Sequence, residues 1–69
     1  MVIIERAWNT AQCKWELTYL ANAASDVAVA DLDPDCAIGS SVLVIASGAM
    51  YIKNTAGQWQ KSGSTEVLA

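Results

Sequence analysis

The chain has 69 residues, of which 54% are hydrophobic and only 16% are charged, and its net charge is −3. Its four basic residues are scattered, so no basic patch is available to neutralise a nucleic-acid backbone. No apolar run approaches the roughly 20 residues that a membrane-spanning helix needs. A domain this small hides little apolar surface by itself. We therefore expect a single domain over residues 1–69 that buries part of its apolar surface against other copies.

The first apolar run and the cysteines indicate the cellular compartment in which the chain is made. Residues 1–4 are apolar, but Glu5 follows at once, so this apolar run is too short for the core of a secretory signal. We therefore expect a protein made in a cytoplasm. Cys13 and Cys36 are too few for a disulfide scaffold and, without histidine, cannot complete a zinc site. They are either free thiols, which cytoplasmic synthesis favours, or bridged to each other. We expect no cofactor.

Residues 2–20 fit two structures. Apolar residues recur at helical spacing at Ile4, Trp8, Ala11, Trp15 and Tyr19. Alternatively, residues 2–8 and 14–20 form a hairpin, since residues 15–19 alternate at period two around a turn that begins at Asn9. The Asn-Thr-Ala of this turn recurs at residues 54–56, where a turn is strongly indicated, and this repeat favours the hairpin.

Residues 21–35 connect the two halves of the chain. Ser25 or Asp26 can cap a short helical turn over residues 27–32, and a short strand over residues 27–30 is the competing interpretation. Pro34 ends whichever element forms, because the residue before a proline avoids helical geometry.

The C-terminal half predicts a three-stranded antiparallel meander. The β-branched run at residues 42–46 is typical of a strand buried on both faces. The connection at Ser47 and Gly48, the strand at 49–53, the Asn54 to Gly57 turn and the edge strand at 58–61 follow in order. Residues 62–69 are expected to be a loose tail or a strand added to a neighbour. The predicted fold class is mainly β: an N-terminal hairpin, one short helical turn and this meander.

Few residues suggest catalysis or metal binding. The absence of histidine removes the commonest general base and the usual nucleophile activation, so we expect no enzyme. Asp31, Asp33 and Asp35 resemble the start of a calcium loop. However, Cys36 replaces its glycine and Val42 its bidentate glutamate, so the EF-hand interpretation fails. A solvated turn and a looser surface calcium site remain as interpretations.

The aromatic and apolar residues carry the two functional hypotheses. The candidate oligomer interface comprises Val42, Val44, Ile45, Met50, Tyr51 and Trp59. The alternative is a glycan- or host-surface-binding module that uses exposed tryptophans. Its candidate residues are Trp8, Trp15 and Trp59.

Several segments resemble a known class of protein. Leu-Asp-Pro-Asp-Cys-Ala-Ile-Gly-Ser-Ser-Val-Leu-Val-Ile at residues 32–45 precedes Met-Tyr-Ile-Lys-Asn at 50–54 and Gly-Gln-Trp at 57–59. The opening Ile-Glu-Arg-x-Trp at residues 4–8 fits the start of the same modules. Together these segments are similar to small modules in virion-surface proteins of tailed bacteriophages, such as head-fibre and decoration proteins.

The resemblance implies a non-enzymatic structural protein of a phage or prophage virion. Such a protein is made in the host bacterial cytoplasm, assembles with itself, with a trimer favoured, and attaches to a capsid or other virion protein. No membrane or nucleic-acid partner is implied. The resemblance carries no functional residues with it, so it assigns none to this chain.

Overall fold

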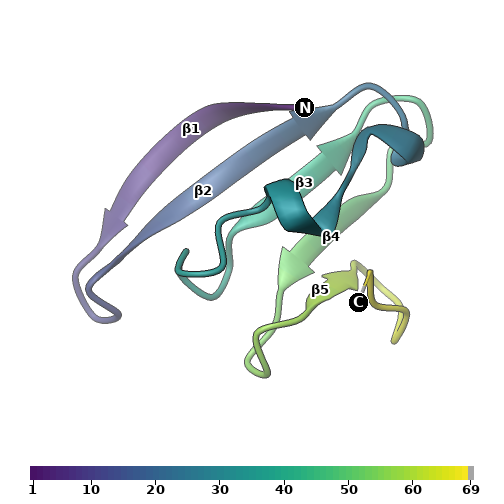
Figure 1. The fold of residues 1–69 in the computed structure, drawn as a ribbon. Helices are drawn as coiled ribbons and strands as arrows, with labels where there is room; N and C mark the ends of the chain where they lie inside the picture. The colour runs from purple at the N-terminus through teal and green to yellow at the C-terminus, as the bar shows by residue number, and fades with distance from the viewer. Residues whose placement is uncertain (69) are drawn as a thin grey trace.

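The computed structural model describes residues 1–68 of the chain, and within them one five-stranded β-sheet forms the fold (Figure 1). The strands are β1 (Val2–Asn9), β2 (Lys14–Ala21), β3 (Ser41–Val44), β4 (Met50–Lys53) and β5 (Trp59–Lys61). Their order in the sheet is their order in the chain. The predicted mainly β class is confirmed.

The N-terminal hairpin pairs β1 with β2 in antiparallel register. The Asn9 side chain accepts a hydrogen bond from the Gln12 amide (3.0 Å), and Cys13 takes a positive φ of 53° to close the turn. A β-bulge lies between Ile3 and Glu5. The hairpin is therefore confirmed and the helical alternative is wrong, because alternation over residues 15–19 outweighed the helical spacing.

The pairing that joins the two halves of the sheet was not predicted. β2 runs parallel to β3, with Tyr19 opposite Val42 and Ala21 opposite Val44. Parallel neighbours need a long crossover connection, because the chain must return to the end where the first strand began. Residues 22–40 are this crossover, and in Figure 1 they lie in front of the sheet.

The crossover contains two 3-10 turns instead of the single helical turn expected. They are η1 (Ala24–Asp26) and η2 (Val29–Asp31). Each is closed by amide-to-carbonyl bonds three residues apart, such as Asp26 to Ala23 at 3.0 Å. The competing strand over residues 27–30 is wrong. The predicted cap is also wrong. Asp26 lies inside η1, and its carboxylate accepts a hydrogen bond from the preceding Ala23 amide (3.3 Å).

The meander prediction is matched only in part. β3, β4 and β5 pair antiparallel in sequence, and Gly57 closes the second turn with φ 80° and an amide bond to the Asn54 carbonyl (2.9 Å). The first turn is longer than the two residues predicted. β3 ends at Val44, whose carbonyl accepts the Gly48 amide at 2.9 Å, so Ile45 lies in the turn.

The core lies on the side of the sheet that the crossover covers, here called the covered face. Its buried residues are Leu17, Tyr19, Ala21, Val42 and Trp59 from the strands, with Leu32 and Cys36 from the crossover. The opposite side, here called the open face, has no such layer among the described residues, and Leu43 is only half-buried there. The prediction that residues 42–46 are buried on both faces is therefore wrong.

Buried polar groups fix the crossover to β2. The Ser40 hydroxyl accepts a hydrogen bond from the Leu17 amide (3.0 Å) and donates one to the Ala37 carbonyl (2.7 Å). The Ala37 amide in turn donates to the Trp15 carbonyl at 2.8 Å. The first half of β2 therefore satisfies its backbone with the crossover instead of with β3.

Lys53 fixes the crossover to β4 in a different way. The residue is buried, and its ammonium group donates to the carbonyls of Pro34 (3.0 Å) and Cys36 (2.9 Å). Carbonyl dipoles thus replace the water that a charged group gives up on burial.

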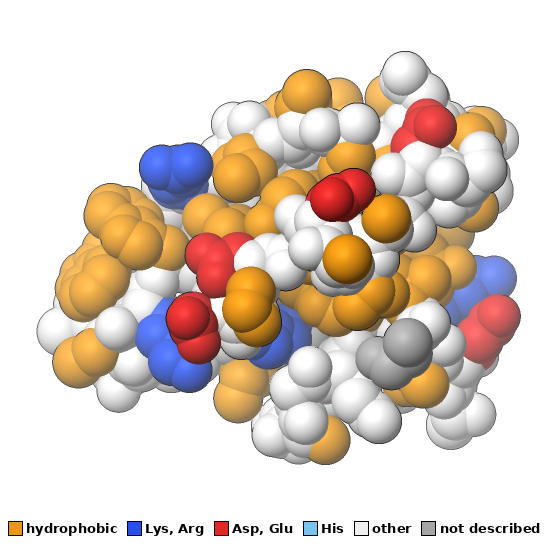
Figure 2. Space-filling model, in the orientation of Figure 1, with side chains coloured by type: hydrophobic (Ala, Val, Ile, Leu, Met, Phe, Trp, Pro, Cys, Tyr) orange, Lys and Arg blue, Asp and Glu red, His pale blue; other side chains and the backbone are white. Residues whose placement is uncertain are grey.

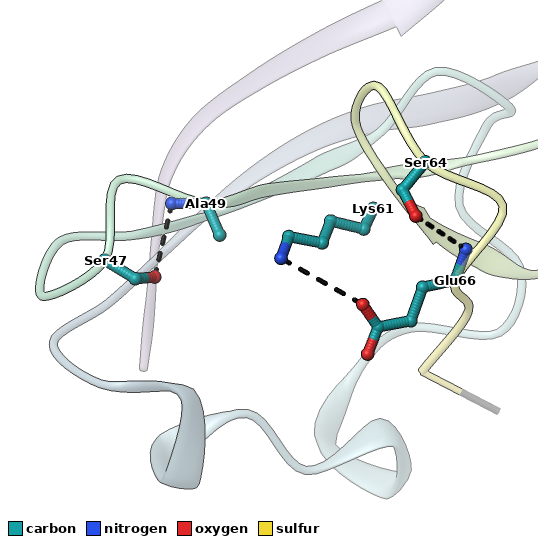
Figure 3. Close-up of polar contacts among 5 residues, drawn as sticks. All are labelled: Ser47, Ala49, Lys61, Ser64 and Glu66. Carbon is teal, nitrogen blue, oxygen red and sulfur yellow. Dashed lines mark hydrogen bonds and ion pairs between the residues drawn. The ribbon is translucent and has the colours of Figure 1, made fainter.

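The C-terminal residues fold back onto β5 of the same chain. The Lys61 amide donates to the Glu66 carbonyl and the Leu68 amide to the Trp59 carbonyl, both at 2.8 Å. Figure 3 shows the weaker Lys61–Glu66 ion pair, with 4.0 Å between the charged atoms, and the Ser64 hydroxyl that accepts the Glu66 amide. This segment therefore covers the outer edge of β5.

We predict that Lys53→Met destabilises the fold by about 2–3 kcal/mol, because two carbonyls lose a charged donor and one of them is buried. Urea unfolding followed by tryptophan fluorescence measures this loss. The matched control is Lys61→Met, whose exposed ion pair contributes at most about 0.5 kcal/mol. Equal stability of the two variants would contradict a structural role for the Lys53 ammonium.

Candidate functional site

The predicted interface residues divide into two groups. Val42, Val44 and Trp59 are buried within a single chain, and the half-buried Tyr51 packs against the same core. Their side chains hold one chain together and are not presented to a partner. Ile45 and Met50 are exposed, at 55% and 38%, and are the members of the set that a partner can reach.

A row of apolar side chains crosses the open face. The strand registers place Val2 opposite Leu20, Leu20 opposite Leu43 and Leu43 opposite Met50. Because paired residues point to the same side of a sheet, these four side chains lie side by side. Val2 and Met50 are exposed and the two leucines are half-buried.

β1 is the outermost strand on one side of the sheet. All its residues are exposed except the half-buried Asn9. Its large apolar side chains include Val2, Ile3, Ile4 and Trp8, with Val2 at 57% exposure. Within residues 1–68, the outer edge of β1 thus pairs with no strand and carries exposed apolar side chains, a combination that favours pairing with another strand.

The three tryptophans have two different environments. Trp8 and Trp15 are about half exposed and contact each other edge to face, with ring centroids 5.3 Å apart and an interplanar angle of 72°. Trp59 is buried against Tyr19, with centroids 6.2 Å apart. The glycan set is therefore reduced to Trp8 and Trp15, whose rings are not coplanar.

A small pocket lies beside this tryptophan pair on the covered face. Its volume is about 180 Å³, and its lining residues are Ile3, Arg6, Trp15, Leu17, Tyr19 and Asp33. Figure 2 views the same side of the molecule and shows hydrophobic side chains gathered at the hairpin end of β1 and β2, with charged groups nearby. The pocket therefore combines an aromatic wall with one cationic and one anionic side chain.

The acidic residues of the crossover do not converge on one point. Among residues 1–68, no group of three or more Asp, Glu, Cys or His side chains is placed to hold a metal ion. The Asp33 carboxylate instead accepts the Asp35 amide at 2.8 Å within its own turn. The structure thus gives the calcium interpretation no support.

The cysteines are not bridged to each other. Cys13 is exposed in the hairpin turn, and Cys36 is buried in the core, so both are free thiols. In the described part of the chain, no helix has the length and hydropathy to cross a membrane.

The exposed residues of β1 and of the open face were largely missed by sequence reasoning. Residues 2–4 are a β-branched, apolar run, which indicates a strand but not its place at the edge of a sheet. Leu20 and Leu43 meet only because β2 and β3 are parallel.

No protein-family model, curated protein or solved structure matches the chain.

Proposed function

We propose that the chain is a non-enzymatic structural module that assembles with itself through apolar β surface. The observation that carries this proposal is the apolar surface that one copy leaves uncovered: the outer edge of β1 and the row of Val2, Leu20, Leu43 and Met50 on the open face. Burying apolar surface is the main driving force of protein association.

The chemistry of the surface supports assembly over catalysis. The sequence has no histidine. Exposed apolar residues occur in both halves of the chain, including Ile4 of β1 and Ile45 of the turn after β3, each at 55%. A contiguous apolar surface on a small protein is typical of an interaction site.

The proposal places the module in the virion of a phage or prophage, attached to a capsid or other virion protein. The support for this placement is the resemblance of residues 32–59 to head-fibre and decoration modules. The uncovered β surface can contact either further copies of the chain or a capsid protein on such a particle. The resemblance favours a trimer, and the mass measured by sedimentation distinguishes a trimer from a dimer.

We predict that the purified chain forms a stable oligomer at micromolar concentration. Because the driving force is apolar burial, raising the salt from 0.1 to 1 M leaves the association unchanged or strengthens it. Sedimentation equilibrium at several concentrations measures the mass under both conditions. A monomer throughout the micromolar range would contradict the self-assembly proposal.

We predict that the protein is a component of phage particles released by the strain that carries the gene. Particles purified on a density gradient are analysed by mass spectrometry, and peptides of this chain are expected at a constant ratio to the major capsid protein. A host cytoplasmic protein of similar abundance serves as the control for contamination. If peptides are found only in the cell lysate, the virion assignment is wrong.

A second candidate function is the binding of a glycan at the hairpin end of the sheet. The observation that favours it is the pocket beside Trp8 and Trp15, since an exposed indole stacks on a sugar ring while Arg6 and Asp33 supply polar partners. Trp59 has no part in this version of the hypothesis, because it is buried.

We predict for this candidate that host cell-wall polysaccharide shifts the tryptophan emission of the wild-type chain. Trp15→Ala is expected to abolish the shift, because Trp15 lines the pocket. Trp59→Phe is the control and is expected to retain it. A shift that survives Trp15→Ala, or no shift with any polysaccharide, would exclude glycan binding at this pocket.

A further inference from the structure

The two outer edges of the sheet differ in how their backbone is satisfied. On the β5 side, Lys61 and Trp59 bond to the returning C-terminal segment, and Gln60 forms an antiparallel bridge with Val67. On the β1 side, no described segment pairs with the outer edge. Within residues 1–68, β1 is therefore the one sheet edge available for adding a strand.

Only part of β1 is suited to regular pairing. The bulge between Ile3 and Glu5 interrupts the ladder, and bulges bend the strand that carries them. Beyond it, residues 5–9 pair with β2 without a further shift. This regular segment has Ala7, a small and exposed residue, at its midpoint.

We propose that a second copy of the chain occupies this edge, with the two β1 strands antiparallel and Ala7 opposite Ala7 across a two-fold axis. This inference deepens the self-assembly proposed above and rests on it. A two-fold axis perpendicular to the sheet makes neighbouring strands antiparallel and keeps the two covered faces on the same side. The two five-stranded sheets then become one continuous sheet.

The charges of β1 select this register over its neighbours. A two-fold axis at Glu5 puts two carboxylates opposite each other, and an axis at Arg6 puts two guanidinium groups opposite each other. Like charges directly opposite each other on paired strands are destabilising. An axis at Trp8 leaves only residues 7–9 to pair within the strand.

The axis at Ala7 gives favourable cross-strand pairs. Arg6 and Trp8 lie on the same side of the sheet, because their partners on β2 are Leu17 and Trp15, two residues apart. Arg6 of each copy then lies opposite Trp8 of the other, an arrangement that permits a cation–π interaction on both sides of the axis. Neither copy places a charge opposite a like charge.

Cysteine cross-linking tests the register directly. In a Cys13→Ser background, Ala7→Cys places two thiols at the axis, within disulfide reach. Glu5→Cys is the matched control, on the same strand and the same face. In the proposed register, residue 5 of one copy lies opposite residue 9 of the other. The two cysteines at position 5 are therefore four residues apart along the strands, or about 14 Å, beyond the roughly 7 Å between Cα atoms that a disulfide can span.

We expect mild oxidation to convert the Ala7→Cys chain to a covalent dimer, as seen on non-reducing gels, and the Glu5→Cys chain at least roughly tenfold more slowly. Similar rates for the two variants, or faster reaction at position 5, would overturn the proposed register. Circular dichroism of both variants checks that the sheet is intact.

A second pair of variants compares how much the β1 edge and the open face contribute to the association. Ala7→Lys sets two ammonium groups opposite each other at the axis and is expected to weaken the association up to roughly fivefold. Met50→Lys, on the open face, is expected to weaken it less, because Met50 takes no part in the pairing of the two β1 strands. If Met50→Lys weakens the association as much as Ala7→Lys or more, or if the wild-type mass is that of a trimer, the edge pairing is wrong while self-assembly stands. A wild-type monomer overturns both.

Discussion

The parallel pairing of β2 with β3 is the constraint on which the rest of the structure depends. Two neighbouring strands that point the same way require the chain to travel back along the sheet between them. Residues 22–40 make this return across one face, and Leu32 and Cys36 from it complete the core. The connection thereby serves as the second layer that a sheet needs in order to bury one side. The other side is left to solvent or to a partner.

A layer made of irregular chain brings buried backbone groups that no helix or strand satisfies. The fold meets this need with a few side chains whose polar atoms reach the loop: Ser40 from its end, Tyr19 from β2 and Lys53 from β4. Each of these side chains forms a hydrogen bond with a backbone group that a helix or a sheet would otherwise satisfy. No buried side-chain nitrogen or oxygen in the described residues lacks a partner. Polar anchoring of this kind suits a chain too short to enclose a thick apolar core.

Local patterns predicted local structure well, and distant pairings not at all. The alternation around Tyr19 and the glycine of the second C-terminal turn act over a few residues, and both were interpreted correctly. The parallel β2–β3 contact joins residues more than twenty positions apart and leaves no periodic signal. Val42 and Trp59 were recognised as apolar anchors, but their burial within one chain, under the crossover, was not foreseen for this reason. The edge position of β1 likewise depends on the whole topology.

The folded-back C-terminal segment leaves the sheet with one edge, that of β1, at which a further strand can be added. A sheet with two open edges can add copies at both and grow into a fibre, because each addition creates a fresh edge. Here residues 66–68 occupy one edge, so a contact at the other creates no new site. In the proposed edge pairing, growth by strand addition therefore stops after one step. The hydrogen bonds that hold residues 66–68 against β5 thus limit the proposed strand addition to two copies.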